Sequence, residues 1–258
     1  TRTLTLTRMP RTRKRRAAAP DPAEGKRRKT GGAGGGRDEA PRPYFVIAAG
    51  AGGTLPSDKA GEPPRSIKTL LAAVGDVDGP VLALRGGAGC GPANLARYQD
   101  YVEAACAGAA AGRKVYLVGQ SFGGRCGVHL WQGGVEERKP PCKPTPWDDK
   151  RPMPSEVRGM IAFGYPLHHA KQDRGAPLRE LEPGTPVLFV MGERDKVALG
   201  PSLDKAVLTD VIDEMPAKET VQVHWVPRAG HNPLDAPKSI REESNDAILE
   251  AVRAFVGA

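Results

Sequence analysis

Short apolar runs and amphipathic stretches alternate along the chain from residue 44 onward. The apolar runs are rich in β-branched residues, which is typical of strands buried on both faces of a sheet. The alternation predicts an α/β fold with a doubly wound, mostly parallel sheet, whose ligands bind at the carboxyl ends of the strands. The expected strands are 44–49, 81–84, 115–118, 160–163, 187–190 and 221–226, and the expected helices are 67–74, 93–111, 203–215 and 239–256.

The first 43 residues show neither pattern. They combine basic clusters, Pro20, Pro22 and the run GGAGGG at 31–36 with few large apolar residues. Such a segment cannot bury enough surface to offset the entropy of ordering it. We therefore expect a disordered basic tail at 1–43 and one domain at 44–258.

The charge of the chain is concentrated in this tail. The formal net charge is +8 over 258 residues, and the first 43 hold 13 Lys and Arg against 4 Asp and Glu. The rest of the chain holds 25 against 26, so the domain is nearly neutral. This distribution argues against a nucleic-acid interface spread over the domain, although the tail itself could touch phosphates.

Two basic clusters in the tail have the spacing of a bipartite nuclear import signal. Lys14 and Arg15 precede KRRK at 26–29 by ten residues. Importin is the expected partner, and the expected location is nuclear, cytoplasmic or both. The alternative is a solvated charge run. Met9 and the residues after it read as a natural start of translation, so residues 1–8 are expected to be either vector-derived or upstream sequence.

The cysteines and the hydropathy pattern narrow the class of protein further. Cys90, Cys106, Cys126 and Cys142 form no CxxC pair and lack zinc-ligand spacing, so we expect free thiols in a reducing compartment and no metal site. No apolar run approaches the roughly 20 residues of a membrane span. A signal-peptide core is also missing from the printed amino terminus.

The sequence Gly119-Gln120-Ser121-Phe122-Gly123 is the sharpest chemical signal in the chain. It follows an expected strand directly and precedes a helical stretch, which is the strand–turn–helix context of a G-x-S-x-G nucleophile elbow. The turn is tight, so the residues two before and two after the serine must lack side chains. The alternative is an ordinary glycine-rich turn.

The partners of such a serine are expected later in the chain, in the order acid and then histidine. Asp195 follows the strand at 187–190, and His231 follows the strand at 221–226. In that arrangement His231 would take the proton of Ser121, and Asp195 would hold the imidazole in the right tautomer. Glu193 is the alternative acid.

An oxyanion hole requires two backbone N–H groups near the serine. Phe122 is expected to supply one, and the loop after the first strand the other, with Ala51 as first candidate and Gly52 next. The glycine-rich segments do not complete a dinucleotide-binding or P-loop fingerprint, so a nucleotide cofactor is not expected.

Four motifs in order together resemble a known family. They are GQSFGGR, FGYPLHH, PVLFVMGERD and VHWVPRAGHN. They are similar to the α/β-hydrolase-like family that includes the testis-expressed protein thirty and the third subunit of the NSL histone-acetyltransferase complex, whose other members are described as dienelactone-hydrolase-like. The resemblance covers about 44–257 and implies an α/β-hydrolase fold without a large cap domain, with Ser121, Asp195 and His231 in the catalytic roles.

Two features depart from the family pattern. Ala49 stands where the first glycine loop often begins with histidine, which affects the expected geometry of that loop. Residues 132–156 form a long proline-rich and charged stretch, expected as either a lid, with Trp147 over the pocket, or a solvated loop.

The remaining histidines divide into two groups. His168 and His169 follow an expected strand and could line the substrate pocket, or they could serve loop packing. His129 lies within the helix that follows Ser121, and His224 lies within a strand, so both are expected to be structural.

The expected function is that of a serine hydrolase that cleaves a small ester or related acyl bond through an acyl-enzyme, without metal or organic cofactor. The alternative is a catalytically silent hydrolase fold that serves as a scaffold in a nuclear or chromatin complex. The resemblance and the import-like tail favour this alternative, and the complete set of three catalytic residues argues against it.

Overall fold

A computed structural model describes residues 41–77, 79–85, 89–136 and 144–257. Its centre is a five-stranded sheet in the order β1-β2-β5-β6-β7, with every neighbouring pair parallel. This confirms the predicted parallel sheet. The strands are β1 (Tyr44–Ala48), β2 (Val115–Gln120), β5 (Val157–Phe163), β6 (Val187–Gly192) and β7 (Val221–Val226). The predicted tail at 1–43 falls almost entirely outside the described residues.

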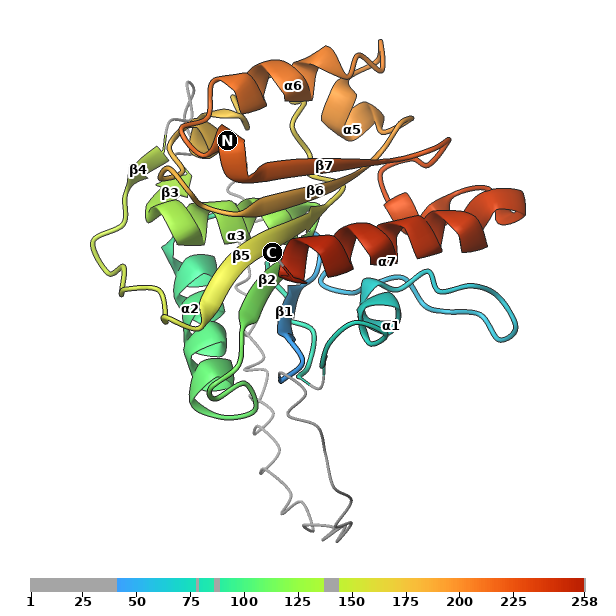
Figure 1. Cartoon of the computed structure of the whole chain (residues 1–258). Helices are drawn as coiled ribbons and strands as arrows, with labels where there is room; N and C mark the ends of the chain where they lie inside the picture. The colour runs from blue at the N-terminus through green and yellow to red at the C-terminus, as the bar shows by residue number, and fades with distance from the viewer. Residues whose placement is uncertain (1–40, 78, 86–88, 137–143, 258) are drawn as a thin grey trace, which may run out of the picture. The chain divides into compact units, whose positions relative to one another are not determined.

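Side chains alternate between the two faces of the sheet, and each face has its own apolar cluster. In β1, Val46 joins one cluster, while Phe45 and Ile47 join the other. Figure 1 shows α2 and α3 on one side of the sheet and α1 and α7 on the other. The helices are α1 (Ile67–Leu71), α2 (Pro92–Ala107), α3 (Phe122–Gln132), α4 (Ala176–Arg179), α5 (Lys196–Leu199), α6 (Ala206–Asp213) and α7 (Arg241–Gly257).

The ends of these helices follow their sequence signals. Gly91 and Pro92 begin α2, since proline at the first helical position lacks only an N–H that the helix would leave unbonded. Gly133, in the left-handed conformation, ends α3. The expected helix at 93–111 stops earlier, at residue 107, because the chain turns at Gly108.

The predicted strand at 81–84 is wrong. Leu82 makes only an isolated parallel bridge to Ala48 at the edge of the sheet, through Leu82 N to Ile47 O at 2.8 Å and Ala49 N to Leu82 O at 3.0 Å. The proline at position 80 cannot donate a further ladder hydrogen bond on that side, so pairing does not extend.

The long stretch at 132–156 contains a structure that the sequence did not reveal. It holds an antiparallel hairpin of β3 (Gly134–Glu136) and β4 (Pro144–Pro146), followed by a buried Trp147. Trp147 belongs to the apolar cluster on the α2–α3 face, and its backbone N–H donates to Gly133 O at 2.9 Å. The described segments between strands therefore hold helices and this hairpin, and no large cap domain.

Three cysteines lie in the described part of the chain. All three are buried, and none of them is in a disulfide there: Cys90, Cys106 and Cys126. Cys142 is outside it. Within the same residues no cluster of His, Cys, Asp and Glu has the arrangement of a metal site. No described helix combines the length and apolar character that crossing a membrane requires.

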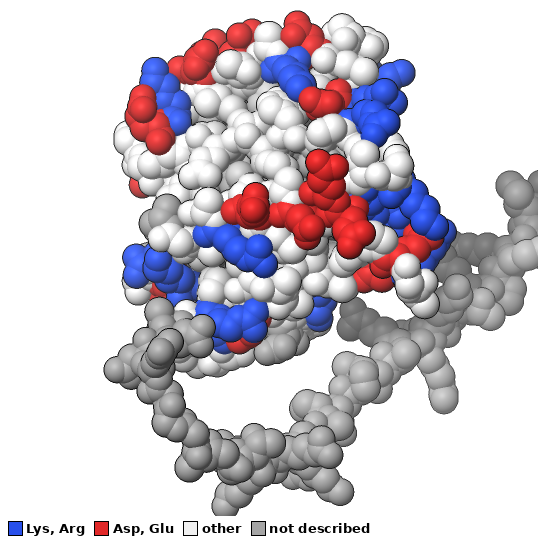
Figure 2. All heavy atoms as spheres, turned by 45° about the vertical axis from the view of Figure 1, so that its right-hand side comes forward, with Lys and Arg blue, Asp and Glu red and all other residues white. Residues whose placement is uncertain are grey.

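The surface of the domain carries both signs of charge. Figure 2 shows acidic side chains gathered near the middle of one face with basic side chains around them. The exposed side of α7 contributes Glu242, Glu243, Asp246 and Glu250, which line a shallow depression. This mixture agrees with the near-neutral charge of 44–258 and differs from a continuous basic surface.

Candidate active site

Ser121 lies at the junction between β2 and α3, in a backbone conformation that residues other than glycine rarely adopt. Its φ is 49° and its ψ is −112°. Its N–H donates to Phe163 O of the neighbouring strand β5 at 2.8 Å, and Arg125 N donates to Ser121 O at 3.2 Å. A non-glycine residue held at positive φ costs on the order of 1–3 kcal/mol, and the flanking strand and helix fix it there.

The two outer glycines of the motif are required by close backbone contacts. A Cβ on residue 119 would lie 2.2 Å from Gly124 N, and a Cβ on residue 123 would lie 2.3 Å from Ala48 O. Both distances are far inside van der Waals contact. Glycine is therefore required at both positions, because any side chain would collide with the backbone of the turn, as the sequence predicted.

Three side chains from separate loops form one hydrogen-bonded series at the carboxyl edge of the sheet. Ser121 Oγ lies 2.8 Å from His231 Nε2, and His231 Nδ1 lies 2.9 Å from Asp195 Oδ2. Because Nδ1–H donates a hydrogen bond to the carboxylate, Nε2 of the neutral ring carries no proton and can accept the proton of Ser121. The three residues predicted to act together are thus brought together.

Asp195 is completely buried, while the side chain of His231 is 34% exposed. The second carboxylate oxygen, Oδ1, accepts from Val197 N at 2.9 Å and Ala198 N at 3.1 Å, at the amino end of α5. A buried carboxylate needs such donors to offset its lost hydration. The aspartate side chain is consequently fixed in orientation toward the imidazole.

Two glycines that sequence reasoning missed allow the histidine loop to reach the strand ends. A Cβ on Gly164, directly after β5, would lie 2.1 Å from His231 O. A Cβ on Gly192, the last residue of β6, would lie 2.1 Å from Gly230 O. Their position immediately at the ends of apolar strands was the available signal, since glycine there often marks a close backbone approach.

Glu193, the alternative acid, is engaged elsewhere. Its Oε1 accepts from Lys205 Nζ at 2.7 Å, and its Oε2 accepts from Arg228 N at 3.4 Å. The hydrogen bond from Lys205 lowers the pKa of Glu193, so this carboxylate is ionised at neutral pH. Its contacts tie the loop after β6 to the turn after β7, and among the carboxylates of the described residues it is Asp195 that bonds to the imidazole.

The loop after β1 lies beside the nucleophile. A Cβ on Gly50 would be 3.6 Å from Gln120 O and 3.8 Å from the Cβ of Ser121. Gly53 N donates to Gly50 O at 2.9 Å, which places Ala51 and Gly52 at the exposed corner of a turn. Phe122, as the first residue of α3, has an N–H without an acceptor in its own helix. The oxyanion roles of Phe122, Ala51 and Gly52 stay predictions.

His168 and His169 lie exposed in the loop after β5. His168 N donates to Val197 O at 3.0 Å, and a Cβ on Gly200 would be 3.3 Å from His168 Nδ1. His169 Nδ1 accepts from Lys171 N at 3.2 Å. These are contacts of loop packing, and a role in the substrate pocket stays a prediction.

The remaining two histidines are part of the framework. His129 is buried, and its Nδ1 lies 3.1 Å from Gly134 O, at the start of the hairpin. His224 is half-buried in β7, where burial lowers its pKa from the usual 6.5. Its Nε2 is buried and has no hydrogen-bond partner among the described residues.

Trp147 does not cover the nucleophile. Its backbone N–H donates to the carbonyl oxygen of Gly133, which lies at the end of α3 far from Ser121. A helix of 11 residues, with a rise of 1.5 Å per residue, spans about 16 Å. The expectation that this side chain serves as a lid is therefore wrong. The solvated-loop alternative is also wrong for Trp147, since the indole is packed into the core.

Comparisons with known proteins agree with this architecture. Residues 42–257 match the family described as "Alpha/beta hydrolase domain". The Thermogutta terrifontis esterase 2, in a structure phosphonylated by cyclosarin, is 13% identical over 84% of this chain and 83% of its own, with a TM-score of 0.50.

Two other solved structures have slightly lower TM-scores. A truncated carbohydrate esterase from gut microbiota is 14% identical, covering 84% of this chain and 88% of its own, with a TM-score of 0.48. A dienelactone hydrolase from Anabaena variabilis is 16% identical, covering 84% and 86%, with a TM-score of 0.47.

Proposed function

Because this chain belongs to the alpha/beta hydrolase domain family, we propose that it is a serine hydrolase that cleaves a small ester or related acyl bond. Ser121 is the nucleophile, His231 the general base and Asp195 the residue that orients the imidazole. The observation that supports this most directly is the series of two hydrogen bonds, 2.8 Å and 2.9 Å long, that joins the three side chains.

The first half of the reaction forms an acyl-enzyme. His231 Nε2 takes the proton of Ser121 while Oγ attacks the carbonyl carbon of the substrate, and the carbonyl π electrons move to oxygen. Collapse of this tetrahedral intermediate breaks the bond to the leaving group, which takes the proton from His231. Buried Asp195 stabilises the transient imidazolium and keeps its Nδ1–H in place.

The second half repeats these steps with water. A water molecule loses a proton to His231 and attacks the acyl carbon, and the serine leaves with that proton. In both halves the oxyanion is stabilised by the Phe122 N–H and by an amide of the Ala51–Gly52 turn. Small residues in that turn let the backbone approach the substrate, and two such donors are worth several kcal/mol.

A fluorophosphonate probe tests the proposal on the intact protein. The folded wild type is expected to be labelled at Ser121, as located by peptide mass spectrometry. Ser121→Ala is expected to lose the label, whereas Ser202→Ala, a change at an exposed serine, is expected to keep it. Hydrolysis of p-nitrophenyl acetate should fall about a million-fold in Ser121→Ala.

The outcome also decides between enzyme and scaffold. The four sequence motifs support kinship with the group of testis-expressed protein thirty and the NSL subunit, and that kinship is the ground for the scaffold alternative. A folded wild type that is not labelled, with labelling of a reference hydrolase in the same tube, would reject the enzyme and favour the silent scaffold.

A further inference from the structure

A cavity lies at the edge of the sheet opposite to Ser121. Its volume is about 510 Å³, and its lining comes from the amino-terminal ends of β2, β5, β6 and β7 and from the last turn of α7. Tyr116 lines this cavity and precedes Ser121 by five residues, so a rise of about 3.3 Å per residue puts them roughly 16 Å apart. A molecule bound here is out of reach of the serine.

Two aromatic rings form the floor of the cavity. Tyr116 and Phe255 are both buried, with their ring centroids 5.8 Å apart. The Tyr116 hydroxyl donates to Val256 O at 3.1 Å, which holds the last turn of α7 against β2. A Cβ on Gly159 would lie 3.1 Å from the Phe255 ring, so the glycine in β5 gives that ring its place. These contacts hold both rings in place, and the floor that they form is apolar.

Two cations stand at one end of this floor. Lys114 and Arg158 are both exposed and both line the cavity. In the described part of the chain, neither has a carboxylate within ion-pair distance. Burial raises the pKa of Tyr116, and the positive charge of Arg158 opposes that rise. Unpaired cations beside an apolar wall favour an organic anion.

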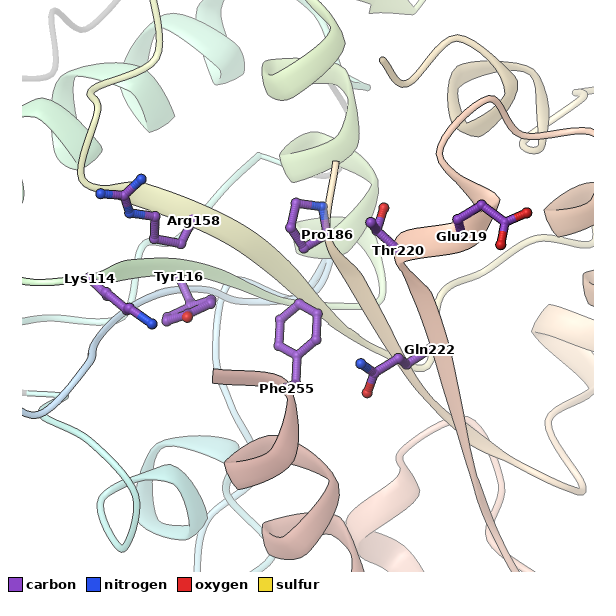
Figure 3. A pocket seen from close by; sticks show the side chains of 8 residues that line it. All are labelled: Lys114, Tyr116, Arg158, Pro186, Glu219, Thr220, Gln222 and Phe255. Atoms are coloured by element: carbon purple, nitrogen blue, oxygen red, sulfur yellow. The ribbon is translucent and has the colours of Figure 1, made fainter. Parts of the chain in front are cut away.

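The opposite end of the cavity accepts hydrogen bonds. Figure 3 shows Lys114 and Arg158 on one side of the Phe255 ring and Glu219, Thr220 and Gln222 on the other, with the amide of Gln222 directed toward the ring and the carboxylate of Glu219 directed away from it. Gln222 is exposed, and its side-chain amide offers an oxygen as acceptor. The cavity therefore has a basic end, an aromatic middle and an acceptor end.

We propose that this cavity binds a small aromatic carboxylate that carries a hydrogen-bond donor opposite its carboxylate. The carboxylate lies between Lys114 and Arg158, the ring lies on Phe255, and the donor faces the amide oxygen of Gln222. The volume suits such a molecule, since small-ligand pockets of proteins typically hold about 300–1,000 Å³. The site is separate from the Ser121 centre and does not depend on catalysis there.

Calorimetric titration of the full chain with 4-hydroxybenzoate tests the proposal. Saturable binding is expected, with a Kd below about 10 mM. The double variant Lys114→Ala/Arg158→Gln is expected to bind at least tenfold more weakly. The matched control Lys59→Ala/Arg253→Gln removes the same charge from exposed positions outside the cavity and is expected to bind as the wild type does. Thermal unfolding of both variants confirms that they fold.

Two further ligands separate the parts of the site. 4-Hydroxybenzamide has the ring without the charge, and inorganic phosphate has the charge without the ring, so each is expected to bind at least tenfold more weakly than 4-hydroxybenzoate. Absence of saturable binding by 4-hydroxybenzoate would overturn the proposal. Equal binding by the Lys114/Arg158 variant, by the amide or by phosphate would overturn it as well.

Discussion

Gly164 and His231 approach each other so closely that no other residue fits at position 164. A Cβ there would lie 2.1 Å from the carbonyl oxygen of His231, and the φ of Gly164 is +58°. The glycine at the end of β5 thus sets the distance between the sheet and the loop that carries the histidine. It contributes to the site without any side chain.

Gly164→Ala is expected to lower both stability and esterase turnover. The methyl group must displace the His231 backbone, which lengthens the bond from Nε2 to Ser121, and the left-handed backbone adds strain of about 1–3 kcal/mol. Gly184→Ala is the control, because Gly184 has a φ of +80° but no atom within 4 Å of the added Cβ. Urea unfolding and p-nitrophenyl acetate hydrolysis measure the two effects. Equal activity of both variants would contradict this role of Gly164.

Replacing each of two glycines of α3 by alanine should have opposite effects on the stability of the protein. At Gly123 the new Cβ would lie 2.3 Å from Ala48 O, so Gly123→Ala should give little folded protein. At Gly127 the nearest atom would be 3.7 Å away, and Gly127→Ala should stabilise the helix by about 0.5–1 kcal/mol. Soluble yield and thermal unfolding report the difference. A well-folded Gly123→Ala variant would contradict the close contact between residue 123 and the carbonyl oxygen of Ala48.

Asp195→Asn should leave the fold intact and remove most of the activity. The amide oxygen can still accept from Val197 N and Ala198 N, but its NH₂ group faces the imidazole and favours the wrong tautomer. A loss of about 10⁴ in kcat is expected. Glu193→Gln, which alters only the pair with Lys205 and Arg228, should stay within a few-fold of the wild type. If the two variants lost similar activity, the assignment of the acid would be wrong.

His224 should make the protein less stable in mild acid. Burial lowers its pKa in the folded state below the usual 6.5, so the unfolded chain binds the proton more readily. The free energy of unfolding should therefore fall as the pH drops below about 6.5 and level off below the folded-state pKa. Urea unfolding at pH 7.5 and 5.5 should show a smaller decrease in His224→Gln than in the wild type. His169→Gln, at an exposed position, should show the decrease of the wild type.

The basic tail should direct the protein to the nucleus. Deletion of residues 9–30 removes both basic clusters, so a large fluorescent fusion of the variant should become cytoplasmic while its melting temperature stays unchanged. The fusion is needed because a 27.4 kDa chain can diffuse through nuclear pores. An unchanged nuclear signal would reject the import signal and leave the solvated charge run.

The sequence by itself determined the parallel sheet and the order of its chemistry. Strands buried on both faces produce continuous apolar runs, which is why five of the six predicted strands are found. Ser121, Asp195 and His231 were predicted to lie together because each stands in the segment after a strand: Ser121 next to β2, Asp195 three residues after β6 and His231 five residues after β7. The prediction of a sixth strand at 81–84 was wrong, because the segment pairs with the edge strand β1 only around Leu82.

Only the tertiary structure decided which groups meet. Trp147 reads as a loop residue, yet it lies in the core, because the hairpin before it folds back onto α3. Asp195 rather than Glu193 bonds to His231, since the first turn of α5 holds one carboxylate while Lys205 holds the other. The position of Gly164 after an apolar strand signals a close backbone approach, but the sequence does not say which residue approaches, because His231 is 67 residues away. Local patterns encode which element a residue joins, and long-range packing decides what that residue touches.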